Sequence, residues 1–154
     1  MHGILMSAMI HLSHSALETE SIAAELAKTL VAGDCIALEG PLGAGKTQFV
    51  RGLAVAVGAN PRAVSSPSFV LLNIYRGGRL TVFHLDAYRI GGADDFESIG
   101  FAELLEQQGV VVVEWADRIA KILPGRRIRV AIEVVGESDR RVTIERLDER
   151  SGQS

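Results

Sequence analysis

The chain has almost no cysteine and no long apolar run, and these absences narrow the classes of protein to which it can belong. Its 154 residues include one cysteine, Cys35, so no disulfide can form within the chain, and this usage is compatible with a reducing cytoplasm. No apolar stretch reaches the roughly 20 residues that a membrane-spanning helix needs. Residues 1–6 lack the basic start and long apolar region of a signal peptide. We therefore expect a cytoplasmic protein that does not bind membranes.

Excess charge of either sign is also small. The formal net charge is −3, and a weakly acidic protein has no general attraction to nucleic acid or to an anionic membrane. Any contact with RNA would then depend mostly on a partner. A basic cluster near the C-terminus could face a partner or tRNA, but solvated strand faces are the simpler interpretation. Its members are Arg126, Arg127, Arg129, Arg140, Arg141 and Arg146.

The most informative motif that is present is a phosphate-binding loop at residues 40–47. The segment GPLGAGKT fits G-x-x-x-x-G-K-[ST] at every fixed position. A short apolar run at 35–38 precedes it and a helical pattern at 47–57 follows it, which is the strand, loop and helix order of a P-loop. Glycines let the backbone N–H groups point inward around an anion, and the start of the helix adds positive potential. We predict that the chain binds a nucleoside triphosphate with magnesium.

Two side chains of this loop have distinct expected roles. Lys46 can reach the β- and γ-phosphates as a point charge, and the Thr47 hydroxyl is placed to ligate Mg²⁺. A chance glycine-rich turn before a helix is a weak alternative, because the fixed residues and their context agree. The residues of the loop and first helical turn that we expect to bind the nucleotide are Gly43, Ala44, Gly45, Lys46, Thr47 and Gln48.

The rest of the pattern predicts an α/β, P-loop NTPase-like three-layer fold. A helix is expected over residues 13–32, where apolar residues recur on one face. The strand before the loop and a β-branched run at 110–114 should be central in a mixed sheet, because that run shows no alternation. Antiparallel hairpins at 69–84 and 127–147 would extend the sheet at its margins.

We find no repeat and no linker that would separate two domains. A single ATPase domain is expected over residues 13–148, preceded by an N-terminal extension at 1–12 and followed by a flexible tail at 149–154.

A phosphate loop also needs an acidic residue that can hold the metal ion. Glu114 ends the buried run at 110–113, close to where Thr47 should lie, and we favour it as a metal ligand over a strand-end salt bridge. A carboxylate there is costly to bury without partners. Asp86 ends another apolar strand. It could orient an attacking water or hold the metal through the metal's coordination shell, or it could simply cap a loop. Lys46, Asp86 and Glu114 are the catalytic candidates.

Other polar residues near these strand ends have two open interpretations each. His84 could be a ligand or a base, although a histidine at a strand end is more often a structural group. Arg89 could contact a phosphate or pair with a carboxylate. Residues 66–69 form either a switch that senses the γ-phosphate or an ordinary turn, and Trp115 is either packing or a wall of the site.

Taken together, these segments resemble the TsaE (YjeE) family, small bacterial ATPases that are required to make threonylcarbamoyladenosine in tRNA. The resemblance covers about residues 13–125 and rests on segments that occur in the same order and spacing. The phosphate loop is shared by many families, whereas HLDAYR followed by VEW is far more specific. The matching segments are GPLGAGKT at 40–47, SPSF at 66–69, HLDAYRI at 84–90, FESIGF at 96–101 and VEW at 113–115.

The resemblance implies a role for several residues. Thr47 and Glu114 would hold Mg²⁺, and Asp86 would be the water-orienting or second catalytic carboxylate. Thr19, near the start of the first helix, aligns with a family position close to the adenine of ATP.

Two segments would behave as nucleotide-sensitive switches in this family, residues 66–69 and 84–89. The chain departs from the family pattern there, because Ser68 and Phe69 stand where threonine and tyrosine are common. Serine keeps the hydroxyl, whereas phenylalanine loses one.

The family's partners are a TsaD-like transferase and its TsaB-like companion, and tRNA would be reached indirectly through them. Nucleotide hydrolysis would reset the transferase complex between cycles, with slow turnover in the isolated protein. The main alternative is a P-loop small-molecule kinase, although the acidic stretch at 91–97 is a poor lid. A regulatory GTPase is disfavoured because the chain has neither N-K-x-D nor D-x-x-G.

Overall fold

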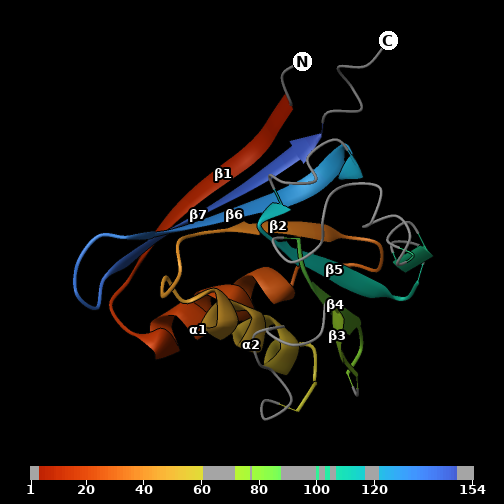
Figure 1. The fold of residues 1–154 in the computed structure, drawn as a ribbon, viewed down its shortest axis with the longest axis horizontal. Helices are drawn as coiled ribbons and strands as arrows, with labels where there is room; N and C mark the ends of the chain where they lie inside the picture. Colours follow the sequence, from red (N-terminus) through yellow and green to blue (C-terminus); the bar gives the residue numbers. More distant parts are fainter. Residues whose placement is uncertain are drawn as a thin grey trace.

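The computed structural model describes residues 4–60, 72–76, 78–87, 100, 103–104, 107–116 and 122–148. Its strands form one seven-stranded sheet in the order β1-β7-β6-β2-β5-β4-β3, and two helices lie side by side on one face of it (Figure 1). The elements are β1 (Ile4–Ser13), α1 (Ala16–Ala27), β2 (Cys35–Glu39), α2 (Lys46–Ala56), β3 (Leu72–Tyr75), β4 (Thr81–Asp86), β5 (Gly109–Glu114), β6 (Arg126–Val134) and β7 (Arg140–Asp148). Neither described helix is long and apolar enough to cross a membrane.

Strands β2 and β5 lie at the centre of the sheet, as the sequence pattern predicted. β2 pairs in parallel with β5 on one side and β6 on the other, and β5 pairs in parallel with β4. Every residue of β5 is buried, which explains its lack of alternation. Because parallel strands end at the same edge, the register partners Asp86 of β4 and Glu114 of β5 come together there.

The antiparallel margins are also confirmed. β3 pairs antiparallel with β4, and β6 with β7. Burial alternates along β6, so this part of the sheet has one packed and one wet face. The expected mixed sheet extended by hairpins is therefore correct.

Apolar side chains cover both faces of the sheet. On one face, Phe49 and Leu53 of α2 pack with Ala23 of α1 against alternate residues of β2, β5 and β6. On the other face, Leu104 and Ala116 pack against the remaining residues of β2, β4 and β5. The strand end that carries the acidic residues is thus held rigidly from two sides.

Helix α1 is shorter than the predicted span of 13–32. It begins after Ser15, whose backbone is extended and whose side chain accepts a hydrogen bond from the N–H of Glu18. It ends near Lys28, where the N–H groups of Thr29 and Leu30 bond three residues back instead of four. These caps, and not the apolar spacing, set the helix bounds.

Strand β1 is an element that the sequence analysis did not expect in residues 1–12. It pairs antiparallel with β7 and forms one edge of the sheet, with a register shift between Leu5 and Ser7. Exposed apolar side chains lie at successive positions along it, among them Met9 and Ile10. An edge strand without alternating burial gives no period-two signal, which is why the sequence pattern did not predict a strand in this range.

The single cysteine provides a test of how rigid the sheet centre is. Cys35 lies on β2 with its side chain buried, and this burial raises the pKa of its thiol to about 12. We predict that a thiol-specific reagent leaves Cys35 unmodified in the folded protein at neutral pH and modifies it fully after denaturation. Mass spectrometry of both samples checks this, and rapid modification of the folded protein would show that β2 opens.

Candidate functional site

The phosphate loop is a tight backbone curl between β2 and α2. Gly43 and Gly45 have φ angles of +81° and +106°, which side-chain-bearing residues rarely adopt. Gly45 is the N-cap of α2, so the N–H groups of the first helical turn have no carbonyl partner within the helix. The N–H of Ala44 closes the turn on the carbonyl oxygen of Pro41 at 3.1 Å. The two glycines thus allow the cradle that the motif predicted.

A cavity of about 620 Å³ lies on the open side of this loop. The loop, the first turns of α2 and the ends of β4 and β5 all contribute to it. Its walls therefore bring together all the predicted catalytic and metal-binding side chains. The lining residues are Leu42, Gly43, Gly45, Lys46, Thr47, Gln48, Arg51, Asp86, Glu114 and Trp115.

Lys46 lines the cavity, and its ammonium group already contacts other groups of the protein. Its Nζ donates to the carbonyl oxygen of Gly40 at 2.8 Å and lies 3.7 Å from Oε1 of Glu114. The ammonium group also lies 4.2 Å from the centre of the Trp115 ring. Both Lys46 and Glu114 have side chains that are 7% exposed. Such a desolvated cation interacts strongly with any anion that enters.

A buried histidine, His84, hydrogen-bonds to the carboxylate of Glu114. Nε2 of His84 lies 2.5 Å from Oε2 of Glu114, and Nδ1 of His84 lies 3.1 Å from the hydroxyl of Tyr75. An ionised carboxylate can only accept, so in this pair the Nε2–H of His84 donates a hydrogen bond to Oε2 of Glu114. His84 is thus buried and hydrogen-bonded at both ring nitrogens, as a structural group would be, and it fixes one carboxylate oxygen of Glu114 while Oε1 faces Lys46.

Trp115 turns the chain sharply where β5 ends. Its φ is +58°, and no other non-glycine residue in the described part of the chain has a positive φ. Such a backbone conformation costs on the order of 1–3 kcal/mol. Its side chain packs against the buried residues beneath the sheet and also lines the cavity. Both open interpretations of Trp115 are therefore correct.

The oxygen donors in the cavity fit a magnesium ion. The Thr47 hydroxyl and the carboxylates of Asp86 and Glu114 are hard donors, and the two carboxylates are register partners on adjacent parallel strands. The described part of the chain has no group of three or more His, Cys, Asp and Glu side chains that could enclose a metal alone. Mg²⁺ in nucleotide sites uses one or two carboxylates and takes its other ligands from phosphates and water, so this donor set suffices.

A second cavity of about 430 Å³ lies beside the same loop, between α1 and the β6–β7 turn. It shares Gly43, Gly45 and Gln48 with the first cavity. Thr19 lines it, and its hydroxyl is hydrogen-bonded to the Ser13 hydroxyl at 2.8 Å. Thr19, the position that the family resemblance associates with adenine, therefore lines a cavity that adjoins the phosphate loop.

Sequence reasoning missed Arg140 as a residue of the site. It was included in the basic cluster interpreted as solvated strand faces, and for Arg140 this interpretation is wrong. Its guanidinium donates to the carbonyl oxygens of Gly43 and Ala44 in the phosphate loop. No sequence motif marks this contact, because the partners are 96 and 97 residues apart. Arg89 and residues 66–69 lie outside the described residues.

Comparison with known proteins identifies the family. The family model for threonylcarbamoyl adenosine biosynthesis protein TsaE matches residues 13–142. The tRNA threonylcarbamoyladenosine biosynthesis protein TsaE of Treponema pallidum is 38% identical over 132 residues, which are 86% of this chain and 96% of that protein. The TsaE of Bacillus subtilis is 39% identical over 133 residues, 86% of this chain and 82% of that protein.

A solved structure agrees with this match. The crystal structure of YdiB from Bacillus subtilis superposes with a TM-score of 0.78 at 31% identity, covering 96% of this chain and 90% of that chain. Its agreement with the present sheet confirms the predicted P-loop fold. With a matching family model over most of its length and a phosphate loop on the central strand, the chain belongs to the TsaE family.

Proposed function

We propose that the chain is a magnesium-dependent ATPase that serves the biosynthesis of N6-threonylcarbamoyladenosine in tRNA. The observation that carries this proposal is the cavity in which Lys46 of the phosphate loop faces Glu114 and Asp86. Family membership supports the pathway, since the relatives are named for threonylcarbamoyladenosine biosynthesis.

Binding of the triphosphate follows from the loop geometry. The N–H groups at the start of α2 and the curled backbone at Gly43 and Gly45 would donate to phosphate oxygens. Lys46 would exchange its bonds to Gly40 and Glu114 for bonds to the β- and γ-phosphates. This exchange is favourable because a phosphate carries more charge than the groups that Lys46 now contacts.

Thr47 and Glu114 would hold Mg²⁺, with Asp86 close to them. When bound, the ion would neutralise negative charge on the phosphate oxygens, which favours attack on the γ-phosphorus. His84 keeps Glu114 in place through the bond to Oε2, so the carboxylate does not need to reorganise when the nucleotide enters.

Hydrolysis would then depend on Asp86 and Lys46. A carboxylate oxygen of Asp86 would accept a hydrogen bond from a water and direct its oxygen at the γ-phosphorus. Lys46 would donate to the oxygens on which charge accumulates as the bond from the γ-phosphorus to ADP breaks. The products are ADP and phosphate.

The proposed partners are a TsaD-like transferase and its TsaB-like companion in the cytoplasm. The net charge of −3 gives this chain little attraction of its own to tRNA, so tRNA would be reached through the complex. ATP turnover would reset that complex between modification cycles.

ATP hydrolysis measured with and without the purified transferase pair tests the proposal. We expect slow hydrolysis by the isolated protein and an increase of roughly tenfold or more with the pair, since a residue supplied in trans can accelerate phosphoryl transfer by about 10³-fold or more. A rate that the pair does not change would contradict the partner role. Phosphate recovered on a metabolite instead of in solution would indicate the alternative, a small-molecule kinase.

A further inference from the structure

The turn between β6 and β7 is tied to the phosphate loop by the side chain of Arg140. Its Nε donates to the carbonyl oxygen of Ala44 at 3.1 Å, and its Nη2 donates to that of Gly43 at 3.3 Å. Its Nη1 donates back to the turn, to the carbonyl oxygens of Asp139 at 2.9 Å and Gly136 at 3.2 Å. One half-buried guanidinium therefore joins two backbone segments that are distant in the sequence.

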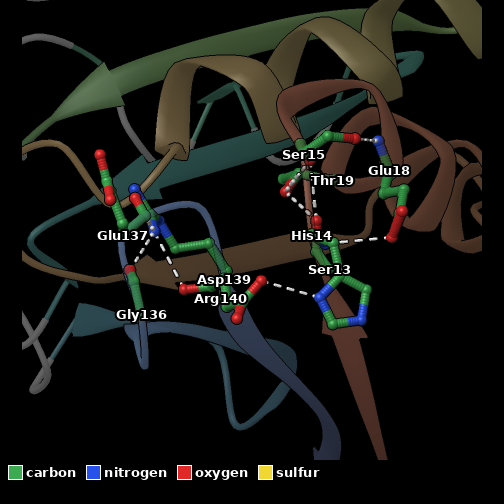
Figure 2. A network of polar contacts seen from close by, with 9 residues as sticks. All are labelled: Ser13, His14, Ser15, Glu18, Thr19, Gly136, Glu137, Asp139 and Arg140. Carbon is green, nitrogen blue, oxygen red and sulfur yellow. Dashed lines mark hydrogen bonds and ion pairs between the residues drawn. The ribbon is translucent and has the colours of Figure 1, made fainter.

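The same turn is also tied to the start of α1. Oδ1 of Asp139 lies 2.8 Å from Nδ1 of His14, and Figure 2 shows this contact beside the bonds of Arg140 to the turn. The hydrogen bond to Asp139 raises the pKa of His14, and the charges of Asp139 and Glu18 act in the same direction. The phosphate loop, the β6–β7 turn and the start of α1 thus form one connected frame around the second cavity.

The two carbonyl groups that Arg140 holds determine where the loop N–H groups point. In a planar trans peptide the C=O and the following N–H point in opposite directions. When Arg140 holds the carbonyl of Ala44, the N–H of Gly45 must point away from Arg140. The carbonyl of Gly43 and the N–H of Ala44 are related in the same way, and that N–H reaches Pro41 within the loop. Arg140 therefore fixes two successive peptide planes of the cradle.

Without the bonds from Arg140, the backbone of the phosphate loop could adopt other conformations. Gly43 and Gly45 adopt positive φ angles, and glycine populates positive and negative φ almost equally. Ordering the loop when a nucleotide binds would then cost conformational entropy that reduces the affinity.

We propose that Arg140 is a positioning residue that holds the phosphate loop in its nucleotide-binding conformation before the nucleotide arrives. This inference rests on the proposed function, because it concerns the binding of ATP by the same loop. A purely structural role for Arg140 would predict a change in stability only, so affinity and loop order are the decisive readouts.

The test compares Arg140→Gln with Arg141→Gln in the full chain. Arg141 is the next residue on β7 and pairs with Glu133 at 3.5 Å on the solvated face, so it is a matched control. We expect Arg140→Gln to weaken ATP binding about five- to tenfold by calorimetry, since it removes charge-assisted hydrogen bonds. We also expect faster hydrogen exchange of the loop amides before nucleotide is added. Arg141→Gln should match the wild type in both.

Arg140→Lys keeps the charge but not the fork that reaches two carbonyls at once. This variant should lose less ATP affinity than Arg140→Gln. It also replaces Arg140→Gln in the comparison if that variant does not fold. ATP affinities of the folded Arg140 variants that equal the wild-type value would overturn the inference while leaving the proposed function intact. Absence of ATP binding by the wild type would overturn both.

Discussion

Replacement of Lys46 by alanine is expected to weaken ATP binding on the order of 100-fold, because it removes charge-assisted hydrogen bonds to two phosphates. The ammonium group is desolvated, with the side chain 7% exposed, so water screens its attraction to an anion only weakly. It also loses little entropy on binding, because the carbonyl oxygen of Gly40 and the ring of Trp115 already hold it. Titration calorimetry with ATP and Mg²⁺ measures the effect.

Lys28→Ala is the matched control for this prediction. Lys28 is well exposed and pairs only at the surface with Glu25 among the contacts described for it, so its removal should leave the ATP affinity unchanged. Thermal unfolding of each variant separates loss of affinity from loss of fold. If Lys46→Ala folds and binds ATP as tightly as Lys28→Ala, the loop does not grip the phosphates.

The parts of the site that the sequence predicted are those encoded by adjacent residues. The loop and Thr47 belong to one continuous motif, and Glu114 could be inferred because it ends a run of buried β-branched residues. Each signal is local, so no knowledge of strand order was needed to find it.

The contacts that hold Glu114 depend on the sheet register, which the sequence pattern does not specify. His84 is a register partner of Val112, two residues before Glu114, so His84 and Glu114 project from the same face of the sheet. A shift of one residue would send them to opposite faces. This is why His84 could be predicted as a structural group while its carboxylate partner could not.

The contact of Arg140 with the phosphate loop could not be predicted from the sequence at all. It depends on β6 lying beside β2, which brings the β6–β7 turn to the same edge of the sheet as the loop. Composition alone placed Arg140 among five other arginines, of which Arg141 pairs with Glu133 and Arg129 with Glu145. Only the fold distinguishes the one that reaches the loop.

Glu114→Gln is expected to reduce ATP hydrolysis about 100-fold or more, because a neutral amide is a much weaker ligand for Mg²⁺ than a carboxylate. The substitution keeps the volume and an oxygen that can accept the bond from Nε2 of His84, so the fold should survive. Removal of the negative charge also relieves repulsion of the phosphates. Metal-free ATP should therefore bind the variant at least as tightly as the wild type, while the affinity for Mn²⁺ falls.

These opposite changes distinguish a metal ligand from a structural carboxylate. Initial rates of phosphate release over a range of Mg²⁺ concentrations measure the loss of turnover, and electron paramagnetic resonance of Mn²⁺ measures the metal affinity directly. Glu133→Gln, at an exposed position on β6 paired with Arg141, controls for the loss of one negative charge and should behave as the wild type. If Glu114→Gln hydrolyses ATP at the wild-type rate and retains its Mn²⁺ affinity, the carboxylate only pairs with Lys46 and His84, and the metal must be held elsewhere.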